Sequence, residues 1–155
     1  MNALSTIQEA LAATVGRRVV FTNGVFDILH AGHVMCLSQA RALGDFLVVG
    51  VNSDESARRL GKGTNRPINT LADRAIVLAG LRAVDYVVAF DEDTPEQTIG
   101  ALQPAIHVKG GDYDAETLPE TTLVRLYGGQ VVIIPLLQGR STTSILKKLS
   151  SEIED

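Results

Sequence analysis

The 155-residue sequence contains one cysteine, Cys36, and no tryptophan. A single cysteine excludes a disulfide framework and a cluster of thiolate metal ligands, and its apolar neighbours predict a small core residue. No apolar run approaches the roughly 20 residues that span a bilayer. The segment before residue 17 lacks the basic start and apolar stretch of a signal peptide. We therefore expect a cytoplasmic protein with no membrane partner.

Positive charge is also scarce. Lysine and arginine total 14 against 18 acidic residues, which gives a formal net charge of -4. Such a balance provides no general attraction to nucleic acid or to an anionic membrane, so any phosphate binding must come from a local site. The length suits a single domain over residues 1–155, with residues 1–16 expected as an extra N-terminal helix.

Five short apolar runs, rich in valine and isoleucine, are bounded by glycine, aspartate or asparagine, which predicts buried strands. The runs lie at 17–23, 45–52, 84–90, 105–110 and 129–136. Helical spacing is found at 33–43, 70–81, 94–102 and 141–153. Pro95 is expected at the first position of the third helix, after a cap at Asp93 or Thr94. Strands alternating with helices predict a Rossmann-like, doubly wound α/β domain with a parallel sheet.

In such sheets the ligand lies beyond the carboxyl ends of the strands, near the point where the strand order reverses. The loops that leave the predicted strands are 23–32, 52–69, 91–94, 109–113 and 136–141. They hold most of the unusual polar residues of the chain. The sequence therefore predicts a site at this edge of the sheet.

The first of these loops ends in His30-Ala31-Gly32-His33, at the start of a predicted helix. A zinc site needs three or four ligands, and the third histidine of the chain, His107, lies in a predicted buried strand. A helix start instead offers free N–H groups and partial positive charge to a phosphate, and Gly32 would let a ligand approach closely. The pattern favours phosphate binding, with a core role for the histidines as the alternative.

The stretch LGKGTNRPINTLADR carries three candidate anion binders, Lys62, Arg66 and Arg74. It is not a P-loop, because Gly63 follows the lysine and Ser56 stands where the early glycine is required. A solvated loop is the alternative.

Three further stretches have two interpretations each. VKGGDY either exposes backbone groups to a ligand or forms a plain turn. In GRSTT, the hydroxyls of Ser141, Thr142 and Thr143 can cap a helix, but with Arg140 they exceed what a cap requires and suit a phosphate. The acidic DEDTPE can hold magnesium or complement a helix start.

Together, TNGVFDILHAGH after a strand and STT before the last helix resemble the HxGH nucleotidyltransferase superfamily. The ordered set that adds VNSD, KGTNRPIN, DRAIVLAGL, VKGGDY, GGQVV and GRSTT resembles the bacterial D-glycero-β-D-manno-heptose 1-phosphate adenylyltransferases, which make ADP-heptose. The resemblance runs from Arg18 to Leu149.

The resemblance implies transfer of AMP from ATP to a sugar 1-phosphate, with release of pyrophosphate and with magnesium bridging the phosphates. It assigns no protein ligand to the metal. The implied catalytic residues are His30, His33, Lys62 and Thr142. The implied ATP-binding residues are Thr22, Asn23, Gly24, Phe26, Gly32, Arg74, Gly110, Gly111, Asp112, Tyr113, Arg140, Ser141 and Thr143. The implied sugar-phosphate-binding residues are Asp27, Lys62, Arg66 and Lys109.

Two departures separate the chain from the glycerol-3-phosphate cytidylyltransferases that it also resembles. Leu136 stands where they carry an arginine, and Lys109 stands where they lack a lysine, which favours the heptose enzymes. A cytidylyltransferase for an alcohol phosphate, an FMN adenylyltransferase and a non-catalytic nucleotide-binding module remain alternatives. The resemblance also implies a heptose kinase on a separate chain, a homodimer or larger homo-oligomer, and no nucleic-acid partner.

Overall fold

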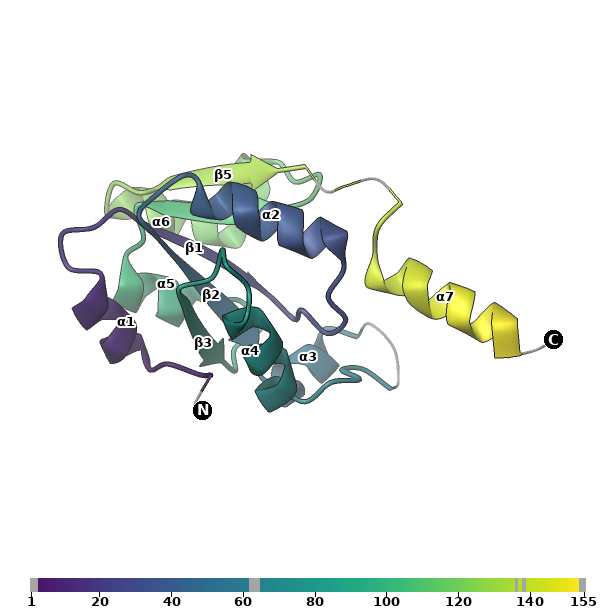
Figure 1. The fold of residues 1–155 in the computed structure, drawn as a ribbon. Helices are drawn as coiled ribbons and strands as arrows, with labels where there is room; N and C mark the ends of the chain where they lie inside the picture. The colour runs from purple at the N-terminus through teal and green to yellow at the C-terminus, as the bar shows by residue number, and fades with distance from the viewer. Residues whose placement is uncertain (1–2, 62–64, 136, 138, 154–155) are drawn as a thin grey trace.

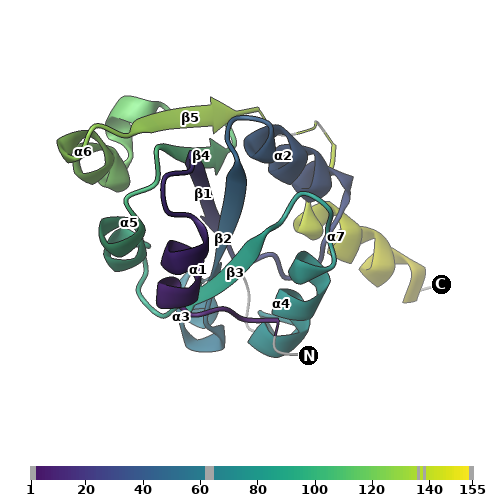
Figure 2. The ribbon, with the colours of Figure 1, turned by 60° about the vertical axis from the view of Figure 1, so that its left-hand side comes forward.

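The computed structural model describes residues 3–61, 65–135, 137 and 139–153, with side chains described as far as residue 149. They form a five-stranded sheet with helices on both faces (Figures 1 and 2). The strands are β1 (Val19–Gly24), β2 (Phe46–Asn52), β3 (Tyr86–Phe90), β4 (Ile106–Gly110) and β5 (Gln130–Ile134). The helices are α1 (Ile7–Ala13), α2 (Ala31–Arg41), α3 (Asp54–Arg59), α4 (Leu71–Ala79), α5 (Glu96–Leu102), α6 (Pro119–Leu126) and α7 (Thr142–Ile153), with a 3₁₀ turn, η1, at Ala115–Thr117.

All strands run parallel, in the order β3-β2-β1-β4-β5. The register places Thr22 of β1 between Val49 of β2 and Val108 of β4. The chain moves outward from β1 to β3 and then returns to β4 on the other side of β1, so the strand order reverses between β1 and β4. This topology confirms the predicted Rossmann-like fold and places the expected site at the carboxyl ends of these two strands.

Helices cover both faces of the sheet, which explains why the strands read as near-continuous apolar runs. Helices α2 and α4 lie over one face, and α1, α5 and α6 lie over the other (Figure 2). The core under α2 and α4 includes Val20, Leu37, Leu47, Val49 and Leu78. The core on the other face includes Ala10, Phe21, Val48, Ile99 and Val124. Cys36 packs partly buried against the first core, as expected of a small apolar residue.

Helix α1 falls within the predicted N-terminal extra helix. It begins with a capping box, in which Thr6 and Glu9 each accept a hydrogen bond from the other's backbone. The preceding residue, Ser5, donates its N–H to the Val87 carbonyl of edge strand β3 at 2.8 Å. These contacts attach the N-terminal segment to the sheet. No helix in the described part of the chain is both long enough and apolar enough to cross a membrane.

Two helices, α3 and α6, lie where the sequence predicted no helix. The loop predicted at 52–69 contains α3, whose start is capped by the Ser53 side chain. Residues 111–128, to which no element was assigned, contain η1 and α6. Helix α3, DESARR, has too few apolar residues to give a periodic signal, whereas α6 is a short amphipathic helix whose apolar residues are Leu123, Val124 and Leu126.

The predicted cap of α5 is wrong. Pro95 itself is the N-cap, with no side-chain capping bond, while the carboxylate of Asp93 accepts a hydrogen bond from Arg59 at 2.9 Å instead.

Candidate functional site

The two histidines of the HAGH motif lie together at the start of α2. His30 is the N-cap residue and forms no side-chain capping bond. Its ring stacks on that of His33, with centroids 3.9 Å apart and an interplanar angle of 25°. Phe26 packs edge-on against His33 at 5.4 Å between centroids. Burial lowers the pKa of His30, so this ring is neutral near pH 7 and carries one N–H donor.

Gly32, the third residue of the HAGH motif, is buried and lies against the segment before α7. A Cβ at this position would lie 3.0 Å from the Cε1 and Nδ1 atoms of His30 and 3.5 Å from the Cβ of Arg140. The glycine therefore leaves room for the His30 ring against the helix. The same contacts place Arg140 beside the start of α2.

The start of α7 is fixed to the loop after β1. The Thr142 hydroxyl donates to the Ile28 carbonyl at 3.2 Å, and Ser141 caps the helix by accepting the Ser144 N–H at 3.1 Å. Arg140, Ser141 and Thr143 are exposed. The N-termini of α2 and α7 thus lie at the same edge of the sheet (Figure 1). Their first N–H groups lack acceptors within the helices and carry partial positive charge, which favours a polyanion.

Asp27 joins the loop after β1 to the segment before α4. Its side chain is fully buried and accepts hydrogen bonds from the N–H groups of Ile68 and Asn69, both at 2.9 Å, and from the Arg66 guanidinium. Burial favours a raised pKa, but these backbone bonds and the Arg66 charge outweigh it, and the pKa of Asp27 is lowered. Two of the four residues expected to bind a sugar phosphate, Asp27 and Arg66, therefore bind each other. We call this cluster, with Ile68 and Asn69, the Asp27 clamp.

Arg74 occupies a different position from the one expected of a triphosphate ligand. Its side chain is completely buried, and its guanidinium donates to the Val25 carbonyl at 2.7 Å, the Asn69 carbonyl at 3.1 Å and the Asp54 carboxylate at 2.7 Å. These bonds join α4 to the loop after β1 and to the start of α3. A direct contact with ATP would require some of them to break, so in this structure Arg74 organises the loops around the site.

Lys109 lies at the point where the strand order reverses. Its Nζ donates to Asn23 Oδ1 of β1 at 3.2 Å and forms an ion pair with Glu120 of α6 at 2.9 Å. His107 lies two residues earlier on β4, buried and stacked on Phe21 with 5.6 Å between centroids. Burial and the Lys109 charge lower the pKa of His107 to about 4. His107 is therefore a core histidine, whereas His30 and His33 lie at the edge of the sheet where the site was predicted.

The turn after β4 places Gly110, Gly111, Asp112 and Tyr113 beside this point. Gly111 has a φ of +142° and donates its N–H to the Ile134 carbonyl at 3.0 Å. A Cβ on Gly111 would meet the Tyr113 ring at 2.7 Å, so that ring covers the turn. Asp112 and Tyr113 are exposed.

Two residues at the carboxyl end of β1, Thr22 and Gly24, shape the backbone rather than present side chains. The Thr22 hydroxyl is buried and donates to the Val108 carbonyl at 2.9 Å. Gly24 accommodates the Phe26 ring, which a Cβ would approach to 3.2 Å. Phe26 has a φ of +50°, a strained conformation for a bulky residue that often marks functional sites. The remaining expected residue, Lys62, lies outside the described residues.

The acidic residues near the site do not form a metal centre. No group of three or more histidine, cysteine, aspartate or glutamate residues able to hold a metal ion occurs within the described ranges. In the DEDTPE segment, Asp91 accepts from Ser53 and Asp93 from Arg59. The described donors therefore do not fit a protein-built magnesium site.

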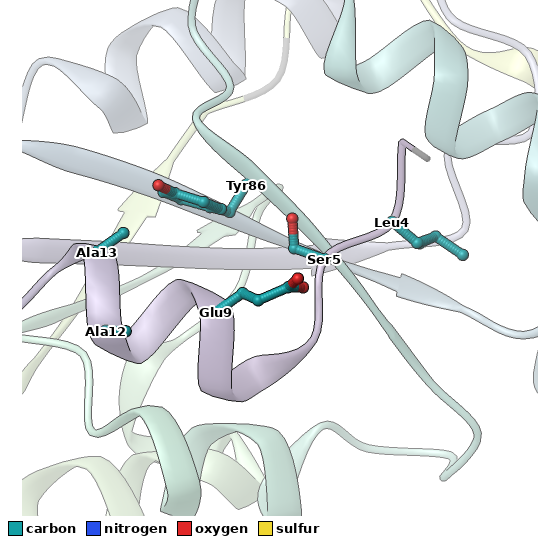
Figure 3. A pocket seen from close by; sticks show the side chains of 6 residues that line it. All are labelled: Leu4, Ser5, Glu9, Ala12, Ala13 and Tyr86. Carbon is teal, nitrogen blue, oxygen red and sulfur yellow. The ribbon is translucent and has the colours of Figure 1, made fainter. Parts of the chain in front are cut away.

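A hollow of about 590 Å³ lies away from this edge, between α1 and the start of β3 (Figure 3). The Glu9 carboxylate in its lining accepts bonds from the Thr6 backbone and side chain, which lower its pKa. No lysine, arginine or histidine is among the described residues that line this hollow, so they offer no positive charge to the phosphates of a nucleotide.

Sequence reasoning missed the partners that hold the site residues. Asp54, Asn69 and Glu120 bind Arg74, Asp27 and Lys109 respectively. Asp54 ends the VNSD motif and Asn69 ends KGTNRPIN, so both lie in stretches that the sequence singled out. Glu120 lies in a segment with no assigned element, so nothing in the sequence placed its carboxylate near β4.

A parallel α/β domain with paired histidines at one helix start, a second helix start beside it, and a lysine at the strand reversal belongs to the class of nucleotide-binding doubly wound proteins. More particularly, the chain is a member of the cytidylyltransferase-like family, whose family model matches residues 21–150.

Several curated proteins are similar over nearly the whole chain. A D-beta-D-heptose 1-phosphate adenylyltransferase of Bordetella bronchiseptica is 59% identical over 149 residues, which cover 96% of this chain and 92% of that protein. The bifunctional protein HldE of Wolinella succinogenes is 56% identical over 134 residues, 86% of this chain but 27% of HldE. The chain thus corresponds to less than a third of the bifunctional relative.

Solved structures show the same fold. A lipopolysaccharide core biosynthesis protein from Thermoplasma volcanium superposes with a TM-score of 0.65 at 32% identity, covering 81% of this chain and all of that one. A pantothenate synthetase from Thermus thermophilus, at 21% identity, superposes with a TM-score of 0.58 over 93% of this chain and 69% of its own. The second likeness concerns the fold alone.

Proposed function

We propose that the protein transfers AMP from ATP to D-glycero-D-manno-heptose 1-phosphate, which yields ADP-heptose and pyrophosphate. The observation that carries this proposal is the stacked pair His30 and His33 between the starts of α2 and α7, at the edge where the strand order reverses. The similarity to a heptose 1-phosphate adenylyltransferase, over 96% of this chain and 92% of that protein, supports the choice of acceptor.

In the proposed reaction, an oxygen of the sugar phosphate attacks the α-phosphorus of ATP in line. The bond from that phosphorus to the oxygen bridging to the β-phosphorus breaks, and pyrophosphate leaves. No covalent intermediate on the protein is needed. The protein must align two polyanions and stabilise the charge that develops on the transferring phosphoryl group and on the leaving pyrophosphate.

The described residues have the positions needed for this alignment. His30 and His33 donate N–H groups to the ATP phosphates, and the backbone amides at the starts of α2 and α7 add fixed dipoles. Thr142, Arg140 and the neighbouring hydroxyls lie beside the same phosphates. A preorganised set of such donors is worth far more than the same donors in water, because no reorganisation is needed during the reaction.

We place the nucleobase over the turn from Gly110 to Tyr113 and the acceptor phosphate near Lys109. Lys62 stays in the proposal on the resemblance alone. Arg66 and Asp27 support the acceptor side indirectly, because each is the other's partner. Magnesium, when bound, neutralises phosphate charge. Since the described side chains do not build a site for it, we assign it no protein ligand and no step.

The proposed substrate also sets the class of reaction that precedes this one. A sugar 1-phosphate arises when a kinase transfers a phosphoryl group to an anomeric hydroxyl, or when a mutase moves the phosphoryl group of another phosphate ester to that position. We therefore expect a heptose kinase to act earlier in the route. The homo-oligomer and the cytoplasmic location stay predictions.

Pyrophosphate release, measured with purified protein, tests the proposal against its alternatives. Four substrate pairs are compared: ATP or CTP, each with heptose 1-phosphate or glycerol 3-phosphate, with magnesium throughout. We expect turnover with ATP and heptose 1-phosphate at least about 100-fold above the other pairs. Turnover of CTP with glycerol 3-phosphate alone would identify the alcohol-phosphate alternative. A fifth assay uses FMN as the acceptor and tests the FMN adenylyltransferase alternative. No turnover with any pair would indicate a non-catalytic nucleotide-binding module.

A further inference from the structure

A buried ion pair links α6 to the strand reversal. The Glu120 residue is 2% exposed, although its carboxylate is charged, and it pairs with Lys109 Nζ at 2.9 Å. Burial favours a raised pKa for Glu120, but the charge and hydrogen bond of Lys109, with a backbone hydrogen bond and His107, together outweigh burial and the pKa is lowered. A buried carboxylate is costly unless a partner requires it. The pair therefore calls for a role beyond stability.

The contacts of Lys109 indicate what that role is. Its Nζ is shared between Asn23 Oδ1 on β1 and Glu120 on α6, so acceptors from two elements fix the ammonium near the carboxyl ends of β1 and β4. The Lys109 side chain remains 19% exposed, whereas the Glu120 side chain is 2% exposed. Lys109 is thus the member of the pair whose side chain keeps surface that a ligand can reach. An ammonium has three N–H donors, and these two contacts use two.

We propose that Glu120 is a positioning residue for the acceptor phosphate, which it serves by holding the Lys109 ammonium at the strand reversal. This inference rests on the proposed function, in which Lys109 binds the sugar phosphate. Without Glu120, the flexible side chain of Lys109 would keep Asn23 as its described acceptor and would occupy several rotamers. The affinity for the acceptor would then fall, while ATP, held at α2 and α7, would bind as before.

A double-mutant cycle separates positioning from a merely structural role. The four proteins are the wild type, Glu120→Gln, Lys109→Met and the double variant. We expect Glu120→Gln to raise the KM for heptose 1-phosphate at least about fivefold and to leave the KM for ATP within about twofold. In the Lys109→Met background, Glu120→Gln should change the acceptor KM by less than about twofold.

Glu116→Gln is the matched control. Glu116 lies just before α6 and pairs with Arg125 of that helix, but both side chains are more than half exposed. The variant removes the same charge from the same region without touching Lys109, so we expect its acceptor KM to equal that of the wild type.

Two results would overturn the inference. One is an acceptor KM in Glu120→Gln equal to that of the wild type. The other is the same fold-change in acceptor KM when Glu120→Gln is made in the wild-type protein and in the Lys109→Met variant. Should Glu120→Gln fail to fold, Glu120→Asp keeps the charge but withdraws it by one methylene. An acceptor KM raised at least about twofold in that variant supports positioning, and a wild-type value contradicts it. Failure of the proposed function is seen separately, as absence of turnover in the wild-type protein.

Discussion

At the scale of single residues, the site depends on how closely side chains pack at one helix start. His30 and His33 stack because they are three positions apart on α2, and Gly32 allows it because it has no Cβ. The neutral state of His30 follows from burial. Each of these properties can be changed by one substitution.

His33→Ala removes one donor to the phosphates. Loss of a single preorganised donor typically lowers the rate about 100-fold to 1,000-fold, so we expect kcat to fall at least about 100-fold in a variant that stays folded. Steady-state kinetics with circular dichroism as a folding control measures this. Near-normal turnover would return His33 to a packing role.

Gly32→Ala is expected to impair activity without unfolding the protein. The added methyl would lie 3.0 Å from the His30 ring, so the ring must shift by a few tenths of an ångström, and kcat should fall at least about tenfold because a small misplacement of a catalytic donor is costly. Gly100→Ala in α5 is the matched control, because a Cβ there meets nothing within 4 Å. It should raise the free energy of unfolding by about 0.5–1 kcal/mol with unchanged kcat. Equal kinetics in both variants would contradict the steric argument.

His107 should make stability depend on pH. Its pKa is about 4 in the folded protein, against 6.5 ordinarily. Between these values the unfolded chain binds more protons than the folded chain, so the free energy of unfolding falls as the pH falls from 6.5 to 4, by up to about 3 kcal/mol. His107→Phe retains the stack on Phe21 and removes the titration. The free energy of unfolding, measured with urea at several pH values, should depend less steeply on pH in the variant than in the wild type. An equal dependence on pH in both proteins would assign the effect to other groups.

At the scale of elements, the segments around the site are held by buried polar contacts as well as by apolar packing. The Asp27 clamp fixes the stretch before α4 to the loop after β1, and Arg74 adds three bonds between the same segments and α3. The structure thus gives both residues a role in shaping the site.

Asp27→Asn should loosen this clamp. The amide keeps one oxygen to accept from the Ile68 and Asn69 N–H groups, but its NH2 group then faces the Arg66 guanidinium, donor against donor, and the Arg66 charge loses its carboxylate partner. Breaking a buried ion pair on one side costs about 3–5 kcal/mol. We expect a loss of this order in urea unfolding, together with faster hydrogen exchange at the Ile68 and Asn69 amides. Wild-type exchange at both amides would show that Asp27 does not hold the segment.

The sequence predicted the strands better than it predicted these connections. Runs such as FLVVGVN are apolar on both faces, so their burial and parallel pairing follow from composition alone. Helix α6 was missed because its buried residues, Glu120, Thr121 and Val124, include only one that is apolar. Contacts such as Asp27 with Ile68 join residues 41 positions apart, and no local pattern encodes them.

At the scale of the whole molecule, the site exists because a parallel sheet brings separate loops to one edge. The strand reversal places β1 beside β4, α2 follows β1 directly, and α7 returns from the far edge strand β5 to the same place (Figure 1). The position of the site therefore followed from the fold class. The ion-pair partner of each cationic side chain did not follow from the fold class. The structure pairs Arg66 with Asp27, Arg74 with Asp54 and Lys109 with Glu120.

The fate of the ATP phosphates tests the central proposal most directly. Wild-type protein is incubated with heptose 1-phosphate, magnesium and ATP labelled at either the α- or the γ-phosphorus, and the products are separated by chromatography. The account predicts that the α-label appears in a nucleotide sugar and the γ-label in pyrophosphate. Transfer of the γ-label to the sugar phosphate, or release of the α-label as free AMP with no nucleotide sugar formed, would contradict it.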